Sequence, residues 1–199
     1  MNSEEKIRKS IGARRNPASA EAILEAAKAV LAESGHAGFS IEAVARRARA
    51  GKPTIYRWWP SRAALLLDVY QRQKQFAYPD TGRIESDIVA FLTNLLANWR
   101  DTVTGPVFRS IIAEAQSDGS AAEALAAYAA SRRIETGRMV ERAVARGEVA
   151  AGVDPAVIAD LVSSFAWVHL LTGRLDVNEE EIRAAARAIT HGIMKKGGA

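Results

Sequence analysis

One short segment near the N-terminus combines cations and aromatic residues in a pattern that suits a polyanionic partner. The segment ARRARAGKPTIYRWWPSR (residues 45–62) contains no acidic residue. Guanidinium and ammonium groups that lack nearby carboxylates can neutralise the phosphates of a nucleic acid. We therefore expect the six cations of this segment to have phosphate rather than carboxylate partners: Arg46, Arg47, Arg49, Lys52, Arg57 and Arg62.

The same segment divides into two short helices separated by a break of about three residues, which is the pattern of a helix-turn-helix. Ser40 is a good N-cap for the first helix, which we expect to end near residue 48. The second is expected over about 52–58, where Ile55 and Trp59 share a face that can pack on Val44. The outer face then offers donors to phosphates and base edges in a major groove: Lys52, Thr54, Tyr56, Arg57 and Trp58.

Charge and composition are consistent with a DNA-binding module joined to a larger domain. The chain has 199 residues and a net charge of +4, but residues 1–72 carry +6 and residues 73–199 carry −2. There is no cysteine, so disulfides and thiolate metal sites are excluded. The first residues are polar and charged, without the apolar core of a signal peptide, and we predict a cytoplasmic protein with no membrane partner.

Helical periodicity extends along the whole chain, and no segment shows the alternation of a β-strand. We predict an all-α protein of about nine helices: a three-helix N-terminal helix-turn-helix domain and a C-terminal helical bundle. The helices are expected over 17–34, 40–48, 52–58, from 61, from 84, from 104, 120–146, 155–172 and from 178. The predicted division is a flexible basic arm (1–15), a DNA-binding domain (16–62) and a ligand-binding and dimerisation domain (63–196).

Residues 38–66, GFSIEAVARRARAGKPTIYRWWPSRAALL, resemble the DNA-binding domain of the TetR family of bacterial transcriptional repressors. The resemblance implies that Ser40 caps the second helix against a phosphate and that Arg62 holds a phosphate at the start of the fourth. It also implies that Trp58 touches the DNA backbone and that Trp59 is buried. The recognition surface that it implies consists of Lys52, Pro53, Thr54, Tyr56 and Arg57.

The turn departs from the family pattern, which commonly has glycine where this chain has Arg49. A positive φ at Arg49 costs on the order of 1 kcal/mol relative to glycine. We therefore expect Gly51 to take the strained conformation instead. Since Gly51 has no side chain, it supplies no cap to the helix that follows.

The helix expected over 155–172 is apolar on nearly every face, so it needs cover on all sides. A second subunit is the simplest cover for the side that its own domain leaves open. The helix expected over 52–58 can contact only a few base pairs, so specific binding also favours a dimer with two such helices. A monomeric bundle with an internal helix is the alternative. The expected dimer residues are Val157, Leu161, Val168, Ile182, Ile189 and Ile193.

Large aromatic side chains in the C-terminal domain suggest a pocket for a flat or apolar small-molecule effector, since such pockets are mostly apolar with a few polar groups. An ordinary core is the alternative for each residue taken alone. The candidates are Trp99, Phe108, Ile112, Tyr128, Phe165, Trp167 and His169.

No catalytic or metal-binding pattern is present, and we predict neither enzyme activity nor a cofactor. The three histidines are far apart, and the chain has no nucleophile elbow or glycine-rich phosphate loop. The preferred function is therefore a repressor that binds a palindromic operator as a homodimer and is released by a small molecule. The alternatives are a non-specific nucleic-acid-binding protein and an all-α small-molecule-binding protein with an incidental basic face.

Overall fold

The computed structural model describes residues 17–73 and 78–192, and these residues form α-helices and no strands. The predicted all-α class is confirmed. The helices are α1 (Pro17–Gly38), α2 (Ile41–Ala48), α3 (Lys52–Tyr56), α4 (Arg62–Gln73), α5 (Ile84–Asp101), α6 (Thr104–Ala115), α7 (Gly119–Ala145), α8 (Pro155–Thr172) and α9 (Glu179–His191). The predicted N-terminal arm, residues 1–15, lies outside the described residues.

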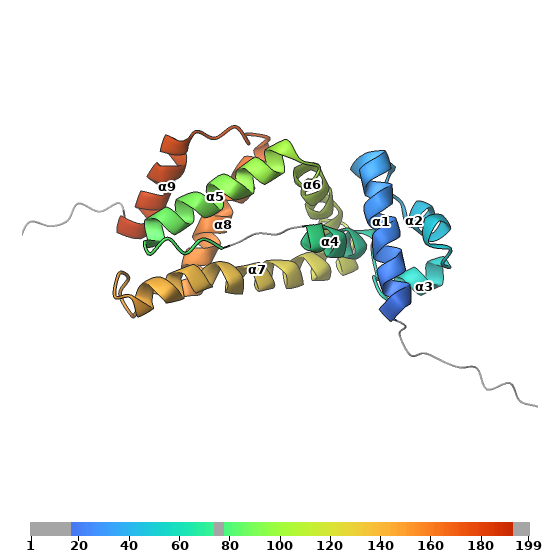
Figure 1. Cartoon of the computed structure of the whole chain (residues 1–199), viewed down its shortest axis with the longest axis horizontal. Coiled ribbons are helices and arrows are strands. Elements are labelled where there is room, and N and C mark those ends of the chain that lie inside the picture. The colour runs from blue at the N-terminus through green and yellow to red at the C-terminus, as the bar shows by residue number, and fades with distance from the viewer. Residues whose placement is uncertain (1–16, 74–77, 193–199) are drawn as a thin grey trace, which may run out of the picture.

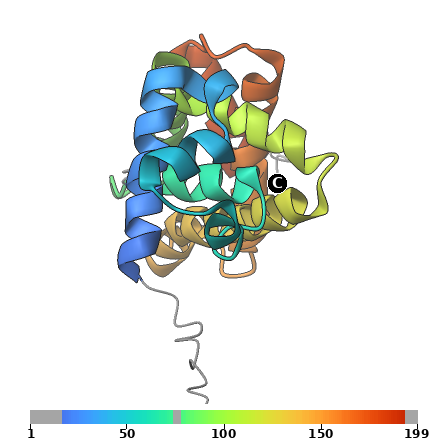
Figure 2. The same cartoon turned by 90° about the vertical axis from the view of Figure 1, so that its right-hand side faces the viewer.

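The helices fall into two groups along the length of the molecule (Figure 1). Helices α1, α2 and α3 form one end, and Figure 2 turns that end toward the viewer. Helices α5, α7, α8 and α9 form the other end. Between them lie α4 and α6, and α4 packs against α1 on one side and against α6 and α7 on the other. Helix α4 is therefore the main link between the two groups, and α1 also touches α6.

Local sequence explains most of the helix ends. In α1 the helical conformation is interrupted at Gly35, whose φ of 63° lies in the left-handed region that glycine adopts without strain. Asp154 and Asn178 cap α8 and α9 through side-chain oxygens. The predicted start of α7 at Ser120 is one position late, because Asp118 is the N-cap and accepts a hydrogen bond from the N–H of Ala121 (2.7 Å).

A close approach of backbones fixes the corner between α5 and α6. A side chain added at Gly105 would place its Cβ 2.2 Å from the carbonyl oxygen of Trp99, well inside van der Waals contact. Only glycine therefore allows α6 to begin this near the end of α5. The corner brings the rings of Trp99 and Phe108 to 5.8 Å, nearly parallel at 16°, and so starts the aromatic cluster that lines the C-terminal domain.

Candidate nucleic-acid interface and internal cavity

The outer face of α3 is the first candidate site, and the helix is oriented as predicted. Ile55 is fully buried and Trp59 is 6% exposed, so both point into the N-terminal core beside Val44. On the opposite side Tyr56 is 47% exposed. Lys52, Pro53 and Arg57 are also exposed, whereas Thr54 and Trp58 are half-buried. Lys52, Pro53, Tyr56 and Arg57 are thus exposed as predicted, whereas Trp58 packs against the core with its indole Nε1 buried. Helix α3 itself lies at the end of the molecule that Figure 2 turns toward the viewer.

The turn between α2 and α3 differs from our expectation. Arg49 is the C-cap of α2 with φ 50° and ψ 38°, the left-handed conformation, whereas Gly51 has an ordinary φ of −72°. The prediction that Gly51 takes the strain is wrong. The N–H of Arg49 and that of Ala50 bond back to carbonyl oxygens in the last turn of α2, and these bonds require the left-handed residue at this position. Gly51 is the N-cap of α3 and, as expected, gives no side-chain cap.

Ser40 caps α2 as predicted: its hydroxyl accepts a hydrogen bond from the N–H of Ala43 (3.2 Å). The hydroxyl hydrogen is not used in that bond, so it remains available to a phosphate oxygen. Ser40 is half-buried at the start of α2.

Three of the six cations have carboxylate partners elsewhere in the chain, which corrects the expectation that none does. Arg47 pairs with Glu33 of α1 (2.7 Å), Lys52 pairs with Glu42 of α2, and Arg62 lies 3.6 Å from Glu114 of α6. The hydrogen bond between Lys52 and Glu42 raises the pKa of the lysine and lowers the pKa of the glutamic acid. The ammonium group of Lys52 has two further N–H donors and is half exposed, so it can bind a phosphate while it keeps its bond to Glu42.

The other three cations of the segment, Arg46, Arg49 and Arg57, are exposed and have no ion pair within residues 17–73 and 78–192. Arg46 lies in the last turn of α2, Arg49 is its C-cap and Arg57 is the C-cap of α3, and together they carry the positive charge without an ion pair in this segment. We call this surface the basic face: Arg46, Arg49, Lys52, Tyr56 and Arg57.

Arg62 is partly buried by contacts within the protein itself, although it is a predicted phosphate contact. Its side chain is 29% exposed, and its Nη1 is buried without a hydrogen-bond partner among the described residues. Its partner Glu114 also accepts a hydrogen bond from the N–H of Ala63 at the start of α4 (3.1 Å). A single carboxylate on α6 thus holds the first turn of α4, next to a predicted phosphate contact.

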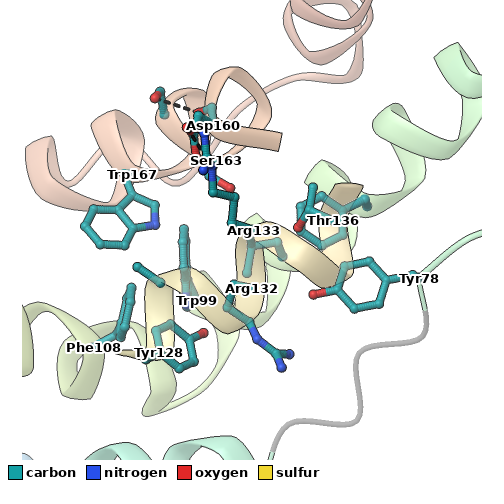
Figure 3. Close-up of a pocket in the computed structure, with 14 residues that line it drawn as sticks. Tyr78, Trp99, Phe108, Tyr128, Arg132, Arg133, Thr136, Asp160, Ser163 and Trp167 are labelled. Carbon is teal, nitrogen blue, oxygen red and sulfur yellow. Dashed lines mark hydrogen bonds and ion pairs between the residues drawn. The ribbon is translucent and has the colours of Figure 1, made fainter. Parts of the chain in front are cut away.

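The second candidate site is a cavity of about 280 Å³ inside the C-terminal domain. It is lined by α5, α6, α7 and α8, with Tyr78 on one side just before α5, and it opens to solvent where the lining residues Arg133 and Asp160 are exposed (Figure 3). Its lining is rich in aromatic rings, which contact one another face to face and edge to face. The aromatic residues are Tyr78, Phe91, Trp99, Phe108, Tyr128 and Trp167.

Four of the seven predicted ligand residues line this cavity: Trp99, Phe108, Tyr128 and Trp167. Phe165 and His169 do not, because they lie on the opposite face of α8 from Trp167, and their rings pack together at 4.4 Å. His169 Nε2 lies 3.3 Å from Glu181 of α9, and its Nδ1 lies 2.8 Å from the carbonyl oxygen of Phe165, so it is a satisfied core histidine. Ile112 lies one turn beyond Phe108 on α6 and is a core residue.

Sequence reasoning missed the polar part of the lining. On α7 it consists of Arg132, Arg133 and Thr136, and on α8 of Asp160, Ser163 and Ser164. The α8 residues precede Trp167 by seven, four and three positions, so they follow its face of the helix. That spacing was available in the sequence, but nothing in it indicated which face of α8 points inward.

The charges in the cavity are unequally compensated. Arg133 donates from Nε to both carboxylate oxygens of Asp160 (3.1 and 3.0 Å), which neutralises the pair. Arg132 belongs to no ion pair between described residues, and its Nε is buried there without a hydrogen-bond partner. Its guanidinium carbon lies 5.8 Å from the centre of the Tyr128 ring.

The tyrosines around the cavity are neutral groups. Burial raises the pKa of Tyr70 to about 12, and the indole N–H of Trp99 donates a hydrogen bond to its hydroxyl (2.9 Å). Burial also raises the pKa of Tyr128 and that of Tyr78, and the nearby Arg132 only partly opposes this. Arg132 therefore faces phenol hydroxyls rather than phenolates.

An apolar stripe on the outside of α8 is the third feature. Val157, Leu161, Val168 and Leu171 are each about half exposed, at positions that share one side of the helix. Three of the six predicted dimer residues belong to this α8 stripe. Ile182 does not, because it is only 3% exposed and packs in the core of its own chain. Ile189 is half-buried beside Ile84 and Val140, and Ile193 lies outside the described residues.

The length and composition of α8 also fit a membrane span, with a mean hydropathy of 1.4 over 18 residues. One such helix is weak evidence for a membrane protein, because helices buried between protein surfaces have the same composition. Here α8 packs against α5, α7 and α9 and carries the buried His169 and the ion-paired Asp160.

Comparisons with known proteins cover both parts of the chain. Residues 23–69 match the family model of bacterial regulatory proteins of the tetR family, and residues 78–189 match that of the tetracyclin repressor-like C-terminal domain. The chain is 31% identical to the HTH-type transcriptional regulator YdeS of Bacillus subtilis, over 86% of this chain and 88% of that protein. It is 30% identical to the DNA-binding transcriptional repressor TetR of Mycobacteroides abscessus, over 78% and 84% of the two chains.

Solved structures show the same fold. The TetR family transcription regulator SCO0332 superposes with a TM-score of 0.77 at 28% identity, over 89% of this chain and 99% of that one. Salmonella enterica GusR superposes with a TM-score of 0.60 over 87% and 96% of the two chains. At 18% identity, this second likeness concerns the fold alone.

Proposed function

The chain belongs to the tetR family of bacterial regulatory proteins, a non-enzymatic family, and is a DNA-binding transcriptional regulator. On this premise we propose that it is a homodimeric repressor that a small molecule releases from DNA. The observation that carries the reading of an operator is the basic face. Three of its five side chains, Lys52, Tyr56 and Arg57, lie on or at the end of α3, whose other side is anchored by the fully buried Ile55. An anchored helix presents its outer side chains to a major groove with little loss of conformational freedom.

The role of each residue follows from its exposure and partners. Lys52, Pro53, Thr54, Tyr56 and Arg57 read the groove. Around them Ser40, Arg46, Arg49 and Arg62 contact phosphates, with Trp58 against the DNA backbone and Gly51 leaving room at the start of α3. We retain the division of the chain at residue 62, although α4 contacts both parts and acts as their link.

The proposed dimer forms through the α8 stripe. Four half-exposed aliphatic side chains in a row on one helix favour burial against a second apolar surface. A second copy of α8 supplies such a surface by two-fold symmetry, because a self-complementary patch meets itself across the axis. Two reading helices then contact two half-sites of a palindromic operator.

The proposed effector site is the internal cavity, and α6 connects it to the DNA-binding end. Phe108 of α6 forms part of the cavity wall, and Glu114 lies less than two turns further along the same helix. Because Glu114 binds the first turn of α4, a ligand that displaces α6 also displaces α4. Such a ligand shifts the protein toward release only to the extent that it binds the released state more tightly.

Selection of bound fragments from random-sequence DNA tests the proposal, and recovery of an inverted repeat is the expected result. On that operator, Tyr56→Ala and Lys52→Ala each weaken binding by about 1–3 kcal/mol, because both side chains lie on the reading surface. Arg183→Ala on α9 is the matched control, since this exposed residue lies at the opposite end of the molecule and its removal leaves affinity unchanged.

Two results contradict the proposal. If random duplexes compete with the selected fragment equally well, the protein is a non-specific nucleic-acid-binding protein. If the chain binds no duplex at moderate salt, the basic face is incidental and the chain is a small-molecule-binding protein. Steep loss of affinity with rising salt is expected for both specific and non-specific DNA binding, since each phosphate contact releases counterions.

A further inference from the structure

The internal cavity combines a planar aromatic lining with one uncompensated cation, and this combination identifies the chemistry of its ligand. We propose that the cavity binds a small aromatic carboxylate, with the carboxylate on Arg132 and the ring among the aromatic side chains. The regulatory meaning of this inference rests on the proposed function, whereas the binding itself does not.

The size and walls of the cavity favour a flat ligand of one or two rings. Its volume of about 280 Å³ is near the lower limit of ordinary small-molecule sites, about 300–1,000 Å³. Trp99 and Phe108 are nearly parallel (16°), and Trp167 meets Phe108 edge to face (87°). Phe108 and Trp99 are almost fully covered, at 0% and 2% exposed, so a ligand ring meets mainly the half-buried rings of Trp167 and Tyr78. A planar ring can stack on these two, whereas a flexible chain loses more conformational entropy there.

The charge of the lining favours an anion. Among the side chains that line the cavity, two are guanidinium groups and one is a carboxylate. The carboxylate of Asp160 is bound by Arg133, so the positive charge of Arg132 has no partner in the lining. A cationic ligand therefore meets repulsion without a free carboxylate, and a neutral ligand leaves the cation uncompensated.

The geometry around Arg132 fits a carboxylate in particular. Its Nε–H is buried without an acceptor among the described residues, while its Nη2 donates to the hydroxyl of Ser131 (3.2 Å). The Tyr78 hydroxyl lies beside Arg132 and Thr136, and burial keeps its pKa above the ordinary value, so it remains a donor. Figure 3 shows Arg132 between Tyr78 and Tyr128. A carboxylate oxygen here accepts bonds from the guanidinium and a phenol at once.

Three probes with the same ring test the proposal on the full-length protein: 2-naphthoate, 2-naphthamide and 2-naphthylmethylammonium. Binding is measured by calorimetry and by quenching of Trp99 and Trp167, both of which line the cavity. We expect 2-naphthoate to bind roughly tenfold or more tightly than 2-naphthamide, since a hydrogen bond to a charged group exceeds a neutral one. The ammonium probe is expected to bind weakest. Equal affinities, a preference for the cation or binding of none of the three overturns the proposal.

Variants test the role of Arg132. Arg132→Gln should remove the preference for the carboxylate over the amide, and Arg132→Lys should retain part of it because the charge remains. Arg138→Gln is the matched control, since Arg138 is an exposed arginine of the same helix that pairs with Glu135 outside the cavity lining, and this variant should keep the preference. If the preference survives Arg132→Gln, the proposal is wrong. Should that variant not fold, the comparison of probes on the unaltered protein still decides.

The experiments distinguish a failure of the proposed ligand class from a failure of the proposed regulatory function. If 2-naphthoate is preferred but does not release operator DNA, the ligand class holds and the effector role of this compound fails. If the operator is bound and no probe enters the cavity, the ligand class fails while the DNA-binding function stands.

Discussion

The contact between α6 and the first turn of α4, which connects the two parts of the molecule, can be tested most directly at Glu114. Its carboxylate on α6 accepts a hydrogen bond from the N–H of Ala63, a residue with no exposed surface, and pairs with Arg62 at 3.6 Å. We expect Glu114→Ala to destabilise the protein and Glu114→Gln to destabilise it much less, because the amide oxygen of glutamine can still accept the Ala63 hydrogen bond.

The magnitude follows from the two interactions. A buried N–H left without an acceptor costs about 1–3 kcal/mol. The ion pair with Arg62 is partly exposed, with side chains 29% and 24% accessible, so solvent screening limits its contribution to ~0.2–0.5 kcal/mol. Glu114→Ala should therefore cost about 2–3 kcal/mol in free energy of unfolding, and Glu114→Gln roughly 0.5 kcal/mol.

Denaturant unfolding measures this difference, at a fixed protein concentration because the proposed dimer would make apparent stability depend on concentration. For a chain of this length, 2 kcal/mol corresponds to a decrease in Tm of about 4–8 °C. Glu25→Gln is the control. Glu25 is also ion-paired within one chain, with Lys28, but its carboxylate is exposed and caps no buried group. Glu25→Gln should change the free energy of unfolding by no more than ~0.5 kcal/mol.

Two results refute the reasoning. Equal losses for Glu114→Ala and Glu114→Gln show that the charge, and not the acceptor for Ala63, is what matters. If Glu114→Ala loses no free energy of unfolding, the first turn of α4 does not depend on α6. The proposed path from the cavity to α3 then lacks the contact between α6 and α4.

The remaining predictions concern the turn and the dimer. Arg49→Gly should raise the free energy of unfolding by roughly 1 kcal/mol, because it removes a left-handed conformation from a residue with a Cβ. The same change should weaken DNA binding and reduce its log–log salt slope by about 0.9, the value for one phosphate contact; an unchanged slope places Arg49 away from the backbone. Leu161→Asp should raise the dimer dissociation constant by roughly a hundredfold or more, since it buries an unpaired carboxylate in each subunit. Sedimentation measures this, with the exposed Thr93→Asp on α5 as control, and an intact Leu161→Asp dimer excludes the α8 stripe as the interface.

The amino-acid sequence by itself determined the helices, most of their ends and the outward face of α3. These features depend on residues within a turn or two of one another: Ser40 at an N-cap, Pro53 in a first turn, Ile55 and Trp59 four positions apart. The helix-turn-helix was predictable for the same reason. The left-handed residue of its turn is Arg49, although the preference of glycine for positive φ predicts Gly51. The deciding interactions are the hydrogen bonds to carbonyl oxygens at the end of α2, which that preference does not include.

Only the tertiary structure decided which distant groups meet. Glu114 reaches Ala63 across 51 positions of the chain, and Arg133 reaches Asp160 across 27. The structure also turned Trp167 into the cavity and Phe165 away from it, on a helix that is apolar on nearly every side. Periodicity gives the angle between two residues on a helix, but the direction in which the helix faces is set by the other helices that pack around it.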